Sequence, residues 1–87
     1  MLFIRLIKLK NPYSKQLKAW FDDKHKEALK WDVKFHYTYF TLGKYDAVSI
    51  IEAPDEKSAT KYALATADEV ESTTMVAIPK DEVDSWL

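Results

Sequence analysis

Hydrophobic and polar positions alternate along the chain in runs that predict four strands and three helices. Residues 2–9 are apolar at both odd and even positions apart from Arg5 and Lys8, which is typical of a strand covered on both faces. We therefore expect this strand in the centre of a sheet. Asn11-Pro12 then provides an N-cap followed by a proline suited to the first turn of a helix.

The first predicted helix begins at Pro12. Its apolar residues recur at spacings of three, four and seven, which is the pattern of a helix that buries one face. These residues are Tyr13, Leu17, Trp20, Phe21, Ala28 and Trp31. Lys24 interrupts this apolar stripe, so we expect the helix to end or bend near it.

A hairpin is predicted in the middle of the chain. Residues 33–42 and 45–53 are rich in β-branched and aromatic side chains, which favour strands. Gly43-Lys44 lies between them and fits a two-residue type II′ turn, because its first position needs a positive φ. The second strand of this pair is apolar at both odd and even positions. The pattern therefore does not decide whether Val48 or Ser49 faces the helices.

A helix and a strand follow the hairpin. Pro54 ends the preceding strand, and Asp55 is expected to cap a helix whose first turn is acidic. Residues 70–78 alternate as a fourth strand, and Pro79 opens a short terminal helix. That helix carries Val83, Trp86 and Leu87 on one side.

The order of elements predicts an α+β fold of the ferredoxin-like βαββαβ type, formed as one domain over residues 1–87. Right-handed crossovers give a four-stranded antiparallel sheet with both helices on one face. The other face would then be uncovered although part of it is apolar. We therefore expect the protein to pair with itself as a homodimer or higher homo-oligomer, in the manner of a dimeric α+β barrel.

Composition excludes several classes of function. The chain has no cysteine, so it forms no disulfide and no thiolate metal site. No apolar run has the length of a membrane span, and no basic, aromatic-rich strand suits RNA, so we expect no membrane or nucleic-acid partner. A cytoplasmic location is the corresponding prediction. The only histidines, His25 and His36, fall on different predicted elements, and we predict neither a metal nor another cofactor.

The net charge of −1 conceals two oppositely charged halves. Residues 1–44 hold ten Lys/Arg and four Asp/Glu, whereas residues 45–87 hold three and ten. Neither half contains a compact run of like charges. The asymmetry is consistent with attraction between the halves inside the fold or assembly, or with a partner-binding surface.

Three segments resemble the GYD-domain family. At the hairpin, residues 41–48 (TLGKYDAV) and 51–55 (IEAPD) are similar to the signature that gives the family its name, and residues 72–82 (STTMVAIPKDE) are similar to its last strand and tail. The sequence departs from the family at Trp31-Asp32, where a glycine is usual. The run from Gly43 through Asp46 is also distantly similar to the ligand-sensing domain of Lrp/AsnC-type regulators.

The resemblance implies a dimeric α+β barrel of the ferredoxin-like kind, and it leaves three functions open. The first is a small-molecule-binding homo-oligomer whose pocket lies between the open sheet face and the hairpin. The second is a cofactor-independent monooxygenase or isomerase, because the same architecture hosts such enzymes. The third is a structural or partner-binding module.

The candidate site residues lie at the hairpin and on the expected open face. They are Gly43, Tyr45, Asp46, Tyr39, His36 and Arg5. His36 and Thr38 fall on the same face of their predicted strand, and such a polar pair favours an orientation away from the helices. Arg5, on an otherwise apolar strand, favours the same orientation. In an enzyme, His36 or Asp46 would move a proton while Arg5 stabilised negative charge.

Asp46 has a structural explanation as well as a functional one. It would either cap the backbone of a neighbouring loop or bind the amine or hydroxyl of a ligand. His36 and the two tyrosines have the same pair of explanations, as hydrogen-bonded structural groups or as pocket residues.

Overall fold

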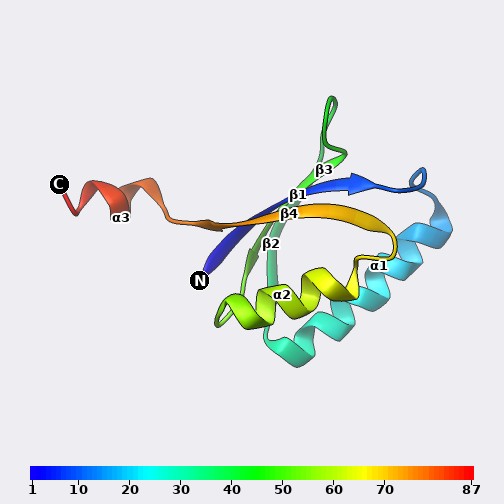
Figure 1. Ribbon diagram of the computed structural model, residues 1–87, viewed down its shortest axis with the longest axis horizontal. Helices are drawn as coiled ribbons and strands as arrows, with labels where there is room; N and C mark the ends of the chain where they lie inside the picture. The colour runs from blue at the N-terminus through cyan, green and yellow to red at the C-terminus, as the bar shows by residue number, and fades with distance from the viewer.

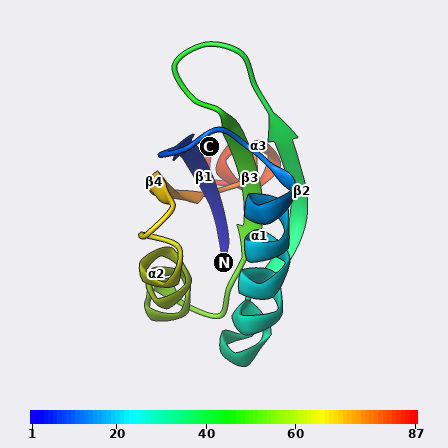
Figure 2. The ribbon, with the colours of Figure 1, turned by 90° about the vertical axis from the view of Figure 1, so that its right-hand side faces the viewer.

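The computed structural model describes residues 1–87 and contains a four-stranded antiparallel sheet with two helices on one face (Figure 1, Figure 2). The elements are β1 (Leu2–Leu9), α1 (Lys15–Ala28), the 3₁₀ turn η1 (Leu29–Trp31), β2 (Lys34–Phe40), β3 (Ala47–Glu52), α2 (Glu56–Ala65), β4 (Val70–Ala77) and α3 (Lys80–Asp84). The strand order is β2-β3-β1-β4. The ferredoxin-like prediction is therefore confirmed.

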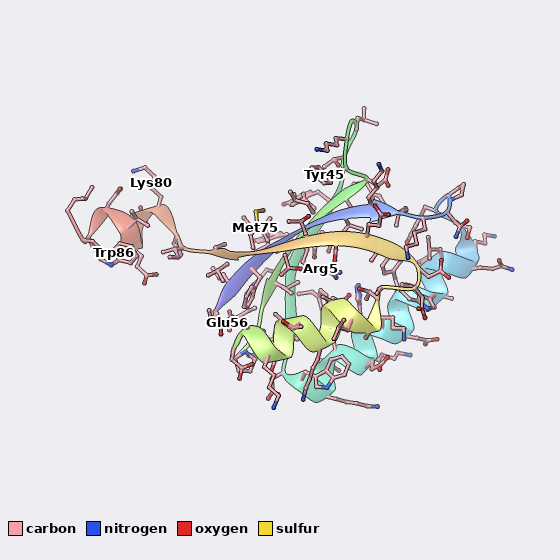
Figure 3. All side chains as sticks on the ribbon, in the orientation of Figure 1. Arg5, Tyr45, Glu56, Met75, Lys80 and Trp86 are labelled. Carbon is pink, nitrogen blue, oxygen red and sulfur yellow. The ribbon has the colours of Figure 1, made fainter.

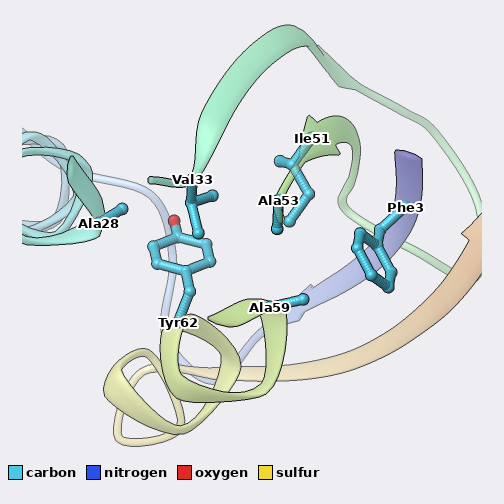
Figure 4. Close-up of a cluster of buried hydrophobic side chains, with 7 residues drawn as sticks. All are labelled: Phe3, Ala28, Val33, Ile51, Ala53, Ala59 and Tyr62. Atoms are coloured by element: carbon cyan, nitrogen blue, oxygen red, sulfur yellow. The ribbon is translucent and has the colours of Figure 1, made fainter. Parts of the chain in front are cut away.

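The core fills the space between the helices and the face of the sheet that they cover, called here the inner face. Its larger cluster contains Phe3, Ala28, Val33, Ile51, Ala53, Ala59 and Tyr62 (Figure 4). Ile7, Ala47 and Val70 form a smaller cluster. Burial of one large aliphatic side chain contributes about 1.5–3 kcal/mol, so these clusters fix the helices to the sheet.

Helix α1 starts later and ends later than its sequence pattern predicts. Ser14, and not Asn11, is the N-cap: its backbone is extended and its hydroxyl accepts a hydrogen bond from the Leu17 amide at 3.1 Å. The predicted break at Lys24 is also wrong, because the helix runs on to Ala28. Lys24 lies at the edge of the apolar face, with its ammonium 5.5 Å from the Trp20 ring centre.

The chain leaves η1 through a left-handed residue. Asp32 has φ 57° and ψ 32°, and no other non-glycine residue has a positive φ. A side chain in this region is strained, although aspartate tolerates it better than most residues.

The β2–β3 connection is longer than the predicted two-residue turn. Strand β2 ends at Phe40 and β3 begins at Ala47, so residues 41–46 form a loop that projects beyond the sheet (Figure 1). The Thr41 amide donates to the Asp46 carbonyl at 2.9 Å, which closes the loop at its base. Gly43 has the expected positive φ, at 115°.

A β-bulge changes which side chains of β2 face inward. The pairing of β2 with β3 shifts register between Phe35 and Tyr37, so that Phe35 opposes Ile51 whereas Thr38 opposes Ser49. Thr38 therefore lies on the inner side, and the prediction that it shares a face of the strand with His36, away from the helices, is wrong. The same pairing places Ser49 inward, which answers the question that the sequence left open.

The face of the sheet opposite the helices has no covering layer within the chain (Figure 2). This open face consists of half-buried aliphatic side chains and exposed tyrosine and methionine side chains. They are Ile4, Leu6, Val48, Ile50, Tyr37, Tyr39 and Met75. Figure 3 shows Met75 on this side of the sheet and Arg5 on the helix side. The predicted position of Arg5 on the open face is therefore wrong, because its side chain is 1% exposed beneath the helices.

The C-terminal segment projects away from the rest of the chain. Strand β4 leads into α3, which lies beyond the sheet and touches neither α1 nor α2 (Figure 1). Its apolar residues are exposed, with Trp86 at 62% and Leu87 at 104%. This C-terminal arm, residues 80–87, therefore has apolar side chains that no other part of the chain covers.

Candidate ligand site

A cavity of about 100 Å³ lies between α1 and the inner face of the sheet. Seven of the twelve residues that line it are hydrophobic. The lining consists of Arg5, Ile7, Leu9, Tyr13, Phe21, Asp22, His25, Thr38, Phe40, Ala47, Ser49 and Tyr62. An apolar wall with a few polar groups is the usual lining of a binding site for a small molecule.

Arg5 brings a positive charge to this cavity from the middle of β1. Its Nη2 donates to the hydroxyls of Thr66 and Ser72, each at 3.0 Å. Its guanidinium carbon lies 4.8 Å from the centre of the Tyr62 ring, in a cation–π contact. Its Nε is buried without a hydrogen-bond partner, and no carboxylate forms an ion pair with it. The guanidinium is thus held by neutral groups alone.

Burial shifts the pKa of three groups around the cavity. It lowers the pKa of Arg5, which nonetheless stays charged because arginine keeps its proton in proteins. It raises the pKa of the Tyr62 hydroxyl, against the opposing effect of Arg5. It also lowers the pKa of His25, which Asp22 raises and Arg5 lowers further. At neutral pH the site therefore contains one cation and a neutral imidazole.

Two hydroxyls face the cavity from the sheet. Thr38 and Ser49 lie opposite each other across β2 and β3, and their oxygens are 3.1 Å apart. Ser49 also donates to the Tyr37 carbonyl at 3.3 Å. These hydroxyls can rotate to donate to a ligand or to accept from it.

Two aromatic rings lie where the cavity meets the surface. The rings of Tyr13 and Phe40 are 4.9 Å apart, and both side chains are partly exposed. Both also line a neighbouring surface hollow that includes Lys10 and Asp46. Tyr13 and Phe40 thus separate the cavity from this hollow.

The predicted site residues of the hairpin do not reach the cavity. Asp46 accepts a hydrogen bond from the Leu9 amide through Oδ2 at 2.7 Å, so it caps the end of β1. This geometry agrees with the structural explanation given for it. Gly43 is in the exposed loop, and Tyr45 lies beside Lys44, whose ammonium is 5.6 Å from the tyrosine ring centre.

The remaining predicted residues lie on the open face. His36 is 3.0 Å from a carboxylate oxygen of Glu52, and both side chains are substantially exposed. Tyr39 stacks on Tyr37, with ring centres 6.1 Å apart. The structure therefore separates Arg5 from the other five candidates, which lie on the open face or at the hairpin loop.

Sequence reasoning missed the helix side of the site. His25 and Phe21 line the cavity from α1, and their spacing of four residues is the signal that could have paired them on one helical face. For Arg5 the sequence has no such signal, because residues 2–9 are apolar at both odd and even positions, and it is strand pairing that places its side chain inward with Phe3 and Ile7.

Taken together, the strand order and the two helices on one face define a ferredoxin-like α+β domain. Residues 9–87 match the GYD domain, so the chain belongs to the GYD-domain family. No curated protein matches it in sequence. Its fold is similar to that of B. subtilis LrpC, with a TM-score of 0.70 and 15% sequence identity. The likeness covers 91% of this chain and 51% of LrpC, so the chain spans about half the length of that protein.

Two further features bear on the class of site. None of the helices has the length and apolar character needed to cross a membrane. No three histidine, aspartate or glutamate side chains are grouped so that they could hold a metal ion.

Proposed function

We propose that this chain is a small-molecule-binding protein that acts as a homodimer, with its ligand in the cavity between α1 and the sheet. The observation that carries the proposal is the meeting of a buried guanidinium, an imidazole and two hydroxyls in one mostly apolar cavity. The proposed pocket is thus on the inner side of the sheet, and not on the open face as the sequence suggested. A cytoplasmic location stays a prediction of the sequence.

The homodimer is supported by two apolar surfaces that the chain does not cover itself. The open face presents Tyr37 at 58% exposure and Met75 at 42%, and the arm presents Trp86 and Leu87. A second copy supplies both kinds of surface at once, so two chains can bury what one leaves in water. We therefore place the second copy against the open face.

Ligand binding is tested by filling the cavity. Ala47 is 3% exposed and lines the cavity, so Ala47→Leu adds carbon atoms to that space. Ala19→Leu adds the same atoms to the solvent-exposed side of α1 and is the matched control. Binding of a fragment library is measured by changes in the ¹H–¹⁵N NMR spectrum.

The expected result is a set of fragments that shifts the amides of cavity residues in the wild-type protein and in Ala19→Leu. Ala47→Leu should weaken their binding at least tenfold. The proposal fails if no fragment shifts these amides, or if Ala47→Leu binds every fragment as the wild type does.

A second function is favoured by the neutral His25 beside Arg5. A neutral imidazole can accept a proton, and a nearby guanidinium stabilises the negative charge that forms. This is the chemistry of the cofactor-independent oxygenase or isomerase, with His25 in the role given above to His36 or Asp46. The test is exchange of the methyl protons of pyruvate, which lie next to its ketone, for deuterium in D₂O, followed by NMR. His25→Gln should abolish any exchange that the wild-type protein catalyses.

A further inference from the structure

We infer that the cavity takes a small organic anion, with its carboxylate bound by Arg5 and its short apolar body against α1. This inference rests on the proposed function, because it names the class of ligand that the same cavity would bind. Its basis is the set of contacts made by Arg5 and the shape and charge of the walls around it.

The first step is the state of the Arg5 side chain. It is 1% exposed, and a buried charge is normally paired with an opposite charge. Nη2 donates two hydrogen bonds, both to neutral hydroxyls, while Nε has no partner. A carboxylate oxygen can accept an N–H bond from a guanidinium, so a carboxylate that reached Nε would supply both the missing charge and the missing acceptor.

The second step concerns the only acid in the cavity wall, Asp22. It would repel an anion if its charge faced the cavity uncompensated. Its carboxylate instead pairs with Lys18 at 3.0 Å on the outer side of α1, where its side chain is 54% exposed. The charge nearest the buried end of the cavity is therefore that of Arg5.

The third step concerns the body of the ligand. Ile7, Leu9 and Phe21 line the cavity with apolar surface, which suits a short hydrocarbon chain and not the shell of water around an inorganic ion. A cavity of about 150 Å³ holds benzene. The space of about 100 Å³ here therefore suits propionate, which is smaller than benzene, whereas isobutyrate, which is about the size of benzene, tests the upper limit.

The experiment compares anions with neutral molecules of the same shape. The wild-type protein is titrated with propionate and isobutyrate, then with propionamide and isobutyramide, and finally with phosphate. Two signals are followed by NMR, the amides of cavity residues and the Arg5 Nε–H resonance. Arg5→Met is titrated in parallel, because it keeps a long side chain and removes the charge.

The expected result is that each carboxylate binds at least tenfold more tightly than its amide and shifts the Arg5 Nε–H signal. Arg5→Met should lose this preference while it still binds the amides. The Nε–H signal of the wild-type protein decides the matter even if Arg5→Met does not fold, because it reports directly on contact with the guanidinium.

The other outcomes are distinct. If amides and carboxylates bind equally well, the cavity is a binding site but the inference of an anion is wrong. If phosphate binds as tightly as propionate, Arg5 binds anions but the inference of an organic ligand is wrong. If no member of the panel binds and the fragment library also gives no binding, the proposed function itself fails. If only library fragments that carry no negative charge bind, the proposed function stands and the inference falls.

Discussion

Arg5 donates from Nη2 to the Thr66 hydroxyl at 3.0 Å, and the same hydroxyl donates to the Ala63 carbonyl at 2.9 Å. The cation on β1 is thus connected to the last turn of α2 through a single side chain. Thr66 is fully buried, so this link is shielded from water. It fixes the guanidinium at one end of the cavity and explains how a charge can be oriented there without an acidic partner.

Arg5→Met should leave the protein as stable as the wild type or more stable. The substitution removes a charge whose burial is unfavourable, and the Thr66 hydroxyl keeps its bond to Ala63. We expect the free energy of unfolding to change by less than about 1 kcal/mol. Arg5→Ala should instead lose about 2–5 kcal/mol, because it enlarges the cavity. Urea denaturation measures both, and a large loss in Arg5→Met would mean that the charge stabilises the fold.

Stability should fall as the pH is lowered below the ordinary histidine pKa of 6.5. Burial lowers the pKa of His25 in the folded protein, so the unfolded chain takes up this proton first and is favoured. The loss should grow until the pH passes below the folded pKa. Tm measured between pH 7.5 and 5 should therefore decrease, and less steeply in His25→Gln.

Two carboxylates, Asp55 and Glu52, change the stability in a lower pH range than His25 does. Their effect can therefore be separated from that of His25. A hydrogen bond from the Ser58 amide lowers the pKa of Asp55, and a hydrogen bond from His36 lowers that of Glu52. Their contributions are present above about pH 4.5 and disappear below it. Equal slopes for the wild type and His25→Gln between pH 7.5 and 5 would contradict the assignment to His25.

The order of the elements could be predicted from the sequence because it depends on local signals. The Asp55 cap is confirmed, with the carboxylate accepting from the Ser58 amide at 2.8 Å. Apolar periodicity likewise located each strand to within a few residues. The length of the β2–β3 loop could not be predicted in this way, because β-branched and aromatic residues continue beyond the last paired residue, Phe40.

The site was harder to predict, because it depends on which face of the sheet each side chain points to. The order of the elements along the chain does not determine this. A one-residue bulge between Phe35 and Tyr37 reverses the alternation of β2, and nothing in the sequence marks it. Arg5 was assigned to the open face because arginine is rarely buried. The pairing of Arg5 with Ser49 and Thr74 places it inward instead. The pairing of the strands, and not the sequence pattern, therefore determines on which side of the sheet these side chains lie.

Asp46→Ala should destabilise the junction between β1 and the hairpin. The substitution removes the acceptor 2.7 Å from the Leu9 amide in a partly buried position, at an expected cost of about 1–3 kcal/mol. Asp46→Asn keeps an oxygen that can accept this bond and should lose less. Hydrogen exchange at the Leu9 amide is the measurement. Unchanged protection of this amide in Asp46→Ala would show that the cap does not hold β1.

Asp32→Gly should stabilise the protein. The residue has φ 57°, where glycine avoids a steric penalty that aspartate bears. The gain should be up to about 1 kcal/mol, because the greater freedom of glycine in the unfolded chain offsets part of it. Asp32→Ala is the control and should destabilise, since alanine keeps the Cβ without the polar group that tolerates this conformation. Thermal unfolding of the three proteins gives the order, and a more stable alanine variant would contradict the argument.

Ile50→Lys should convert the proposed homodimer to single chains. Ile50 lies at the centre of the open face, between Ile4 on β1 and Tyr37 on β2. A lysine there faces water in the single chain but would be buried without a partner between two sheets. Leu64→Lys is the matched control, because Leu64 is 71% exposed on α2. Light scattering after size exclusion should give twice the chain mass of 10.1 kDa for the wild type and Leu64→Lys, and one chain mass for Ile50→Lys. A wild-type protein of one chain mass, or an Ile50→Lys variant that stays paired, would mean that the open face is not where two copies meet.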